Sequence, residues 1–198
     1  MDSKSSAATV RDMAAAGSSL PTSSCLQTAR LKDGTLITIR AIRPTDLSSL
    51  RSAFNRMSPE TRYLRFHAHL TDLPLASWIY LTNVDGRDHV ALVARAGDRI
   101  VGVARFIRLG DRSERAEVAF VVVDDFQHRG LGRALRDALL TQARIRGVRF
   151  LHASVLSDNV GIRRLLAGPR LSLVSDNGDQ LIVRVTDELQ RGVLLPFR

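Results

Sequence analysis

The sequence has a single cysteine, Cys25, so the chain can form no internal disulfide and no cysteine metal cluster. That usage is typical of a reducing compartment, and we expect a cytoplasmic protein. No apolar run approaches the ~20 residues that a membrane-spanning helix needs, so we expect no membrane association. Neither a Gly-x-Gly-x-x-Gly fingerprint nor a Gly-Lys-Ser/Thr phosphate loop occurs, which leaves NAD and ATP binding unsupported.

Lysine is almost absent as well: of the 29 basic residues only Lys4 and Lys32 are lysines, and the formal net charge is +9. A positive surface attracts anions, so the charge fits an enzyme for a phosphate-bearing substrate as well as a nucleic-acid binder. The arginines are spread along the chain, and no zinc-finger, basic-zipper or RNA-binding aromatic pattern occurs, which argues against nucleic acid. His67 and His69 have no carboxylate or cysteine at a ligand-like spacing, so we expect no metal site.

The periodicity of the chain indicates one α/β domain with tails at both ends. Residues 1–28, rich in Ser and Ala, are expected to be a disordered tail, 29–187 the folded domain and 188–198 a C-terminal tail. Ser58 is expected to cap a helix that begins at Pro59. The other predicted helices cover 46–57, 75–81, 133–146 and 159–167, and the predicted strands cover 35–43, 89–95, 100–109, 116–123, 148–155, 171–174 and 180–185. This order predicts a mixed sheet with helices packed on it.

The most informative segment runs from the apolar strand that ends near Val123, through a glycine-bearing turn, into a helix. Free backbone N–H groups at such a helix start form an anion site. Gly130 and Gly132 let phosphate oxygens approach the backbone, and Arg129 and Arg133 can add charge-assisted contacts. The alternative is a glycine-capped turn with no ligand.

Gln127-His128-Arg129-Gly130-Leu131-Gly132 resembles the acetyl-CoA signature (Arg/Gln)-x-x-Gly-x-(Gly/Ala) of the GCN5-related N-acetyltransferase (GNAT) family. The resemblance covers residues 36–185 and implies an α/β (α+β) fold with a mixed, mostly antiparallel sheet flanked by helices. It implies that the loop amides bind the pyrophosphate of acetyl-CoA and that the strand before the loop pairs with the pantetheine arm. Asn159 matches a cofactor-contacting asparagine of the family, and its alternative role is a helix N-cap. The cofactor contacts expected in this way are Phe120, Val121, Val122, Gln127, His128, Arg129, Gly130, Leu131, Gly132, Arg133 and Asn159.

Glu117 is the candidate general base. Transfer to an amine requires a neutral nucleophile, and a carboxylate beside the thioester can take the proton. Glu117 is the only acid within residues 116–123; the alternative is a carboxylate that is solvated or paired with Arg105 or Arg115. Residues 115–122 and 57–66 resemble bacterial Pat-type protein lysine acetyltransferases, which place a catalytic glutamate in the first of these segments.

This resemblance implies an N-acetyltransferase for a protein lysine or small amine, working by direct attack in a ternary complex, with a homodimer left open. Two departures from the family pattern stand out: the helix after Asn159 contains no tyrosine, and Gly168-Pro169 replaces the family's Gly-Phe. They keep a second hypothesis open, a non-catalytic acyl-CoA-binding regulatory module. A nucleic-acid-binding protein is the third hypothesis.

Overall fold

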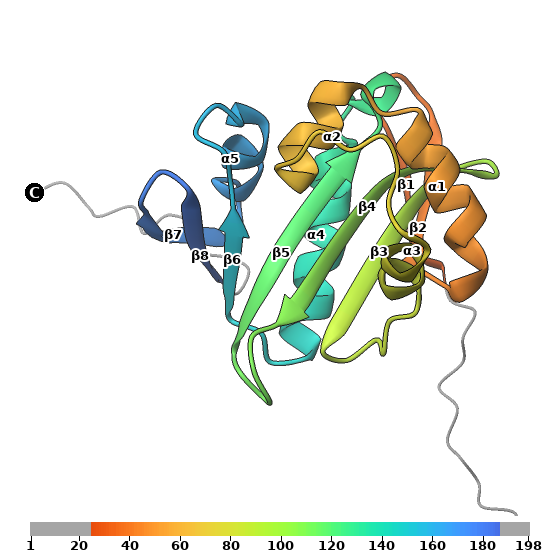
Figure 1. Cartoon of the computed structure of the whole chain (residues 1–198). Coiled ribbons are helices and arrows are strands. Elements are labelled where there is room, and N and C mark those ends of the chain that lie inside the picture. Colours follow the sequence, from red (N-terminus) through yellow and green to blue (C-terminus); the bar gives the residue numbers. More distant parts are fainter. Residues whose placement is uncertain (1–24, 187–198) are drawn as a thin grey trace, which may run out of the picture.

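An eight-stranded mixed sheet forms the framework of the computed structural model, which describes residues 25–186 (Figure 1). The strand order is β1-β2-β3-β4-β5-β6-β8-β7. Neighbouring strands pair antiparallel except β5 and β6, which are parallel. This confirms the expected mixed, mostly antiparallel sheet. The strands are β1 Cys25–Arg30, β2 Leu36–Ala41, β3 His89–Ala96, β4 Arg99–Arg108, β5 Arg115–Val122, β6 Phe150–Ser154, β7 Leu171–Asp176 and β8 Gln180–Val185.

Five helices flank the sheet, in the order that the sequence predicts. They are α1 Leu47–Asn55, α2 Pro59–Phe66, α3 Leu75–Thr82, α4 Leu131–Ile145 and α5 Val160–Leu166. The predicted cap of α2 is present, since the Ser58 hydroxyl accepts a hydrogen bond from the Thr61 amide at 3.1 Å. The first predicted helix differs at its start, because Pro44–Asp46 form a 3₁₀ turn before α1 begins.

Helices cover both faces of the sheet. α4 lies behind the central strands in Figure 1, and α1, α2 and α3 lie in front. Gly102 of β4 allows the close approach of α4: a Cβ there would stand 2.9 Å from a methyl carbon of Leu135. On the opposite face Phe54 of α1 packs edge-on against Trp78 of α3 and Phe66 of α2, with ring centroids 5.5 and 5.7 Å apart. The sheet is thereby buried on both sides around β3, β4 and β5.

Strand β1 was not predicted from the sequence, and it starts inside the segment assigned to the N-terminal tail. Its residues pair antiparallel with β2, from Cys25 opposite Arg40 to Arg30 opposite Leu36. Residues 27–30 are mostly exposed, so this edge strand lacks the apolar alternation that identifies a strand in a sequence. The remaining tail assignments, for residues 1–24 and 188–198, lie outside the described residues.

No helix within residues 25–186 is long and apolar enough to cross a bilayer. The same part of the chain holds no cluster of three or more His, Cys, Asp or Glu side chains that could bind a metal ion.

Candidate active site

Strands β5 and β6 separate soon after they meet. Their parallel pairing runs only from Arg115 opposite Phe150 to Glu117 opposite His152, whereas β5 remains paired with β4 as far as Val122. The sheet therefore opens beside residues 118–122, with α2 on one side of the opening and α5 on the other (Figure 1).

Two hollows occupy this opening. The first, which we call the turn hollow, has a volume of about 340 Å³. The second, the Glu117 hollow, has a volume of about 300 Å³. The residues that border both hollows, and so mark the joint between them, are Leu64, Arg65, Phe120, Asn159 and Ile162. Together the two hollows form a continuous path from the turn before α4 to the middle of β5.

The turn before α4 presents a run of backbone N–H groups. Within residues 25–186, the amides of residues 128–133 have no backbone acceptor; the first amide of α4 that has one is that of Ala134, which donates to the Gly130 carbonyl at 3.2 Å. Gly130 and His128 both lie in the left-handed region, at φ 96° and 58°. Gly130, Gly132 and His128 thus shape a concave turn whose free donors fit the charge of a pyrophosphate.

Three residues of this turn that are predicted to contact the cofactor, Arg129, Leu131 and Arg133, differ in where their side chains lie. The Arg129 guanidinium binds the Asp33 carboxylate at 2.8 Å and stacks over the Phe126 ring at 5.1 Å, so it points to the β1–β2 loop. Leu131 is fully buried, which leaves only its amide for a ligand. Arg133 is exposed on the first turn of α4.

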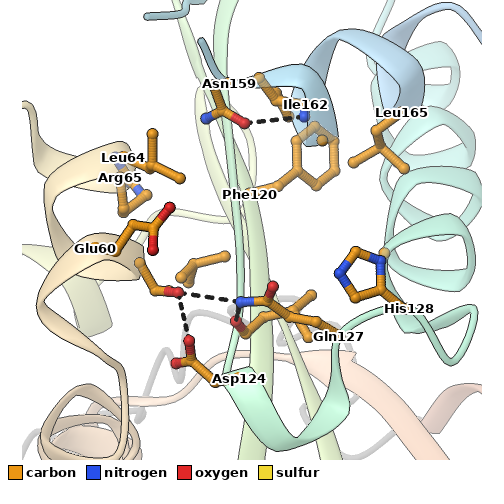
Figure 2. A pocket seen from close by; sticks show the side chains of 15 residues that line it. Glu60, Leu64, Arg65, Phe120, Asp124, Gln127, His128, Asn159, Ile162 and Leu165 are labelled. Atoms are coloured by element: carbon orange, nitrogen blue, oxygen red, sulfur yellow. Dashed lines mark hydrogen bonds between the residues drawn. The ribbon is translucent and has the colours of Figure 1, made fainter.

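Gln127 ties the turn to its surroundings. Its Nε2 atom donates to the Val122 carbonyl at 3.2 Å and to the Thr61 hydroxyl at 3.1 Å. Thr61 donates in turn to Asp124 at 2.8 Å, and Asp124 also accepts from the Ser58 amide at 2.9 Å and hydroxyl at 2.7 Å. Figure 2 shows the part of this chain of bonds that joins Gln127 to Asp124 along the wall of the turn hollow. It fixes the start of α2 to the end of β5.

The predicted strand contacts and Asn159 line the opening. Phe120, Val121 and Val122 all border the turn hollow. Asn159 caps α5, accepting from the Ile162 amide at 3.1 Å, and it also borders both hollows (Figure 2). Its two expected roles, cap and ligand contact, are therefore compatible in space.

Glu117 lies on β5 in the Glu117 hollow, with an exposed side chain. Among the described residues it has no hydrogen bond or ion pair, so neither Arg105 nor Arg115 neutralises it through a direct contact. Arg65 is near enough for the Glu117 charge to act on the pKa of its guanidinium. Position and exposure leave this carboxylate free to accept a proton in the opening.

Helix α2, for which the sequence predicts no part in the site, supplies one wall of the opening. Glu60, Thr61, Leu64 and Arg65 border the turn hollow, and Figure 2 shows the Glu60 carboxylate directed into it. The signal available in the sequence was the resemblance of residues 57–66 to the Pat-type helix. Facing α2, Ile162 and Leu165 of α5 close the other side.

Comparison with known proteins agrees with this geometry. A family model described as the acetyltransferase (GNAT) family matches residues 49–167. Acetyltransferase Pat of Mycolicibacterium smegmatis is 34% identical over 139 residues, which are 69% of this chain and 41% of that protein, so the chain spans about two fifths of that relative. Acetyltransferase PA5475 of Pseudomonas aeruginosa is 30% identical over 139 residues, 68% of this chain and 74% of that protein.

The crystal structure of the GNAT domain of S. lividans PAT superimposes with a TM-score of 0.74 at 28% identity, covering 80% of this chain and 96% of that one. A structure of yncA of Salmonella typhimurium, solved with its cofactor acetyl-CoA, shares the fold at 20% identity and a TM-score of 0.60, covering 78% of this chain and 96% of that one. The expected family and fold are confirmed, and the chain belongs to the acetyltransferase (GNAT) family.

Proposed function

We propose that this chain transfers the acetyl group of acetyl-CoA to a primary amine, on a protein lysine, by direct attack in a ternary complex in the cytoplasm. The observation that carries the proposal is the opening between β5 and β6, with free backbone amides at one end and the Glu117 carboxylate at the other. An extended donor lying along this path brings its reactive end to the carboxylate.

Acetyl-CoA supplies the acyl group as a thioester. The amides of residues 128–133 would hold its pyrophosphate, since they lack backbone acceptors within residues 25–186. Residues 120–122 would bind the pantetheine arm in the place that β6 leaves empty beside β5. Leu165 and Ile162 would cover the arm from α5 and keep water out.

Glu117 would act on the acceptor. A lysine amine must lose a proton to attack the thioester carbonyl, and the Glu117 carboxylate takes it, directly or through a water molecule. The new C–N bond forms as the C–S bond breaks, and the thiolate receives a proton from solvent, because α5 has no tyrosine to donate one.

The test measures thiol release from acetyl-CoA with lysine peptides, folded proteins and small amines as acceptors. Glu117→Gln is expected to lower kcat by roughly 10²–10⁴-fold at neutral pH, the usual contribution of a general base. Glu114→Gln is the matched control, since Glu114 lies three positions earlier and pairs with Arg149 at 3.2 Å, away from the opening. Full activity of Glu117→Gln would remove this residue as the base.

The absence of tyrosine from α5 motivates an alternative, a non-catalytic acyl-CoA-binding module. Measuring both acetyl-CoA binding and turnover distinguishes the two hypotheses. Saturating acetyl-CoA at a hundred times its dissociation constant raises the free energy of unfolding by ~2.7 kcal/mol. Stabilisation of that size with no turnover on any acceptor would favour the module. If acetyl-CoA neither stabilises the protein nor is turned over, acetyl-CoA is excluded as the donor.

A further inference from the structure

Two arginines, one on α2 and one on the sheet beneath it, have no carboxylate in hydrogen-bond or ion-pair contact within residues 25–186. Arg105 of β4 is only 5% exposed. Its Nη1 atom lies 3.2 Å from Nε2 of His89, and its Nη2 donates to the Leu81 carbonyl at 3.3 Å. Neither neighbour is an anion: burial and the charge of Arg105 lower the pKa of His89 to about 4, so its ring is neutral at pH 7, and a backbone carbonyl carries no charge. The charge of Arg105 therefore has no counterion among the described residues.

Arg65 of α2 is the second of these arginines. It stacks over the Phe66 ring at 5.0 Å, and in the part of the chain that the structure describes its guanidinium has no hydrogen-bond acceptor and no ion pair. Burial lowers its pKa, and Glu117 opposes that effect from within the opening. Arg65 stands at the joint of the turn hollow and the Glu117 hollow.

Both arginines border a third, small hollow, which we call the arginine hollow. Its volume is about 30 Å³, and Arg65 links it to the two hollows of the opening. A cavity needs roughly 10–15 Å³ to hold one water molecule, so the arginine hollow has room for about two, which matches the two oxygens of a carboxylate. The remaining lining is apolar: Leu50, Phe54, Met57, Phe66, Trp78, Leu81, Val103, Ala119 and Val121.

The charges around the arginine hollow are unbalanced. Burial, and then the charge of Arg65, lower the pKa of Arg105 to about 9, so the group is still a cation at pH 7. Tyr80 acts on Arg105 in the opposite direction, and Glu117 is the carboxylate that acts on Arg65. Buried charges in folded proteins are normally paired, so a buried Arg105 and a half-buried Arg65 around one apolar hollow indicate a missing anion.

We propose that the arginine hollow receives a carboxylate at the far end of the donor's acyl chain, so that the enzyme uses a dicarboxylic acyl-CoA such as succinyl-CoA in addition to acetyl-CoA. The inference rests on the proposed function, which puts the thioester at the joint that Arg65 borders. Planar guanidinium groups bind carboxylates through paired hydrogen bonds, which gives direction as well as charge. In the transfer the amine nitrogen bonds to the thioester carbon, the C–S bond breaks, and the distal carboxylate is unchanged.

The test compares succinyl-CoA with butyryl-CoA, whose chain has the same number of carbons and no charge, on one acceptor, with acetyl-CoA as reference. Enzyme-free rates are subtracted, because such thioesters also acylate amines unaided. We expect kcat/KM for succinyl-CoA to exceed that for butyryl-CoA at least tenfold, and calorimetric Kd values to follow the same order. In Arg65→Gln the succinyl-to-butyryl ratio should fall toward one. In Arg99→Gln, which removes an exposed arginine at the start of β4, the ratio should be unchanged.

A ratio near one in the unaltered protein, or the same ratio in Arg65→Gln, would overturn the inference. A carboxylate on the acceptor peptide can bind the same arginines as a carboxylate on the acyl chain. The comparison is therefore repeated with acceptor peptides that carry or lack an acidic residue next to the lysine. If Arg65→Gln changes the acceptor preference and leaves the donor ratio alone, the donor assignment is wrong. Turnover of acetyl-CoA with no succinyl preference rejects this inference alone. If no donor turns over, the proposed function fails, and the Kd ratio still decides whether the hollow selects a carboxylate.

Discussion

Replacing Asp124 by asparagine tests how the start of α2 is held against β5. The Asp124 carboxylate accepts bonds from the Ser58 amide and hydroxyl and from the Thr61 hydroxyl, all between 2.7 and 2.9 Å. Asparagine has nearly the same shape, but it carries no charge and only one accepting oxygen. Hydrogen bonds to a charged group are worth ~1.5–3 kcal/mol each when shielded from water, and the exposure of Asp124 reduces this. We expect a total loss of about 2 kcal/mol, or a fall in Tm of roughly 4–8 °C.

The effect should depend on pH. Partial burial raises the pKa of Asp124, but the bonds from Ser58 and Thr61 lower it by more, so the folded-state pKa lies below the unfolded value. The stabilisation is therefore present above the unfolded pKa of ~3.9 and is lost as pH falls through the folded one. The stability difference between the wild type and Asp124→Asn should be full at pH 7 and shrink as pH is lowered from 5 toward 3.

Urea unfolding at several pH values measures this difference. Thr61→Val removes one donor with little change of shape, and its combination with Asp124→Asn should show a coupling energy of about 1 kcal/mol. Asp125→Asn is the control, since Asp125 is the exposed neighbour and its side chain makes no hydrogen bond within residues 25–186. The reasoning is refuted if Asp124→Asn matches the stability of Asp125→Asn at pH 7.

Three further results are expected. Gly130→Ala should lose about 1 kcal/mol of stability or more, because φ is 96°, and should weaken CoA binding in calorimetry; unaltered CoA affinity would count against the turn as the pyrophosphate site. Gly168→Ala should cost ~1–3 kcal/mol in thermal unfolding, because the new Cβ would stand 1.8 Å from Nη1 of Arg136, and Arg136→Gln should recover part of that loss; a stable single variant would contradict this packing. His89→Gln should remove a pH dependence: the folded pKa of about 4 lies below the unfolded 6.5, so wild-type stability falls as pH drops from 6.5 toward 4, by roughly 1.4 kcal/mol for each pKa unit. An equal slope in the two proteins, measured by urea unfolding, would exclude His89 as its source.

Features with a strong local cause could be predicted from the sequence. The cap at Ser58 and the glycine turn before α4 follow from nearby residues, and both are present. The family followed from the same turn together with the strand before it. Local patterns also located Glu117 and Asn159 beside one opening, although their roles stay predictions.

Features that depend on distant contacts could not be predicted in this way. Strand β1 is held by pairing with β2, and its own side chains give little signal. The α2 wall becomes part of the site because Asp124 and Gln127, more than sixty positions away, bind Ser58 and Thr61. Arg65 and Arg105 meet at one hollow although forty positions separate them, and no spacing rule brings them together.

The early separation of β6 from β5 leaves an unpaired strand border in the middle of the sheet, where most folds have none. An unpaired strand at the outer edge of a sheet can pair with a strand of another protein, and this promotes aggregation. Here α2 and α5 stand on either side of it and narrow the access to it. Some backbone hydrogen-bonding groups of β5 can therefore stay unpaired and available to a ligand, without forming an open strand edge that other protein molecules could pair with.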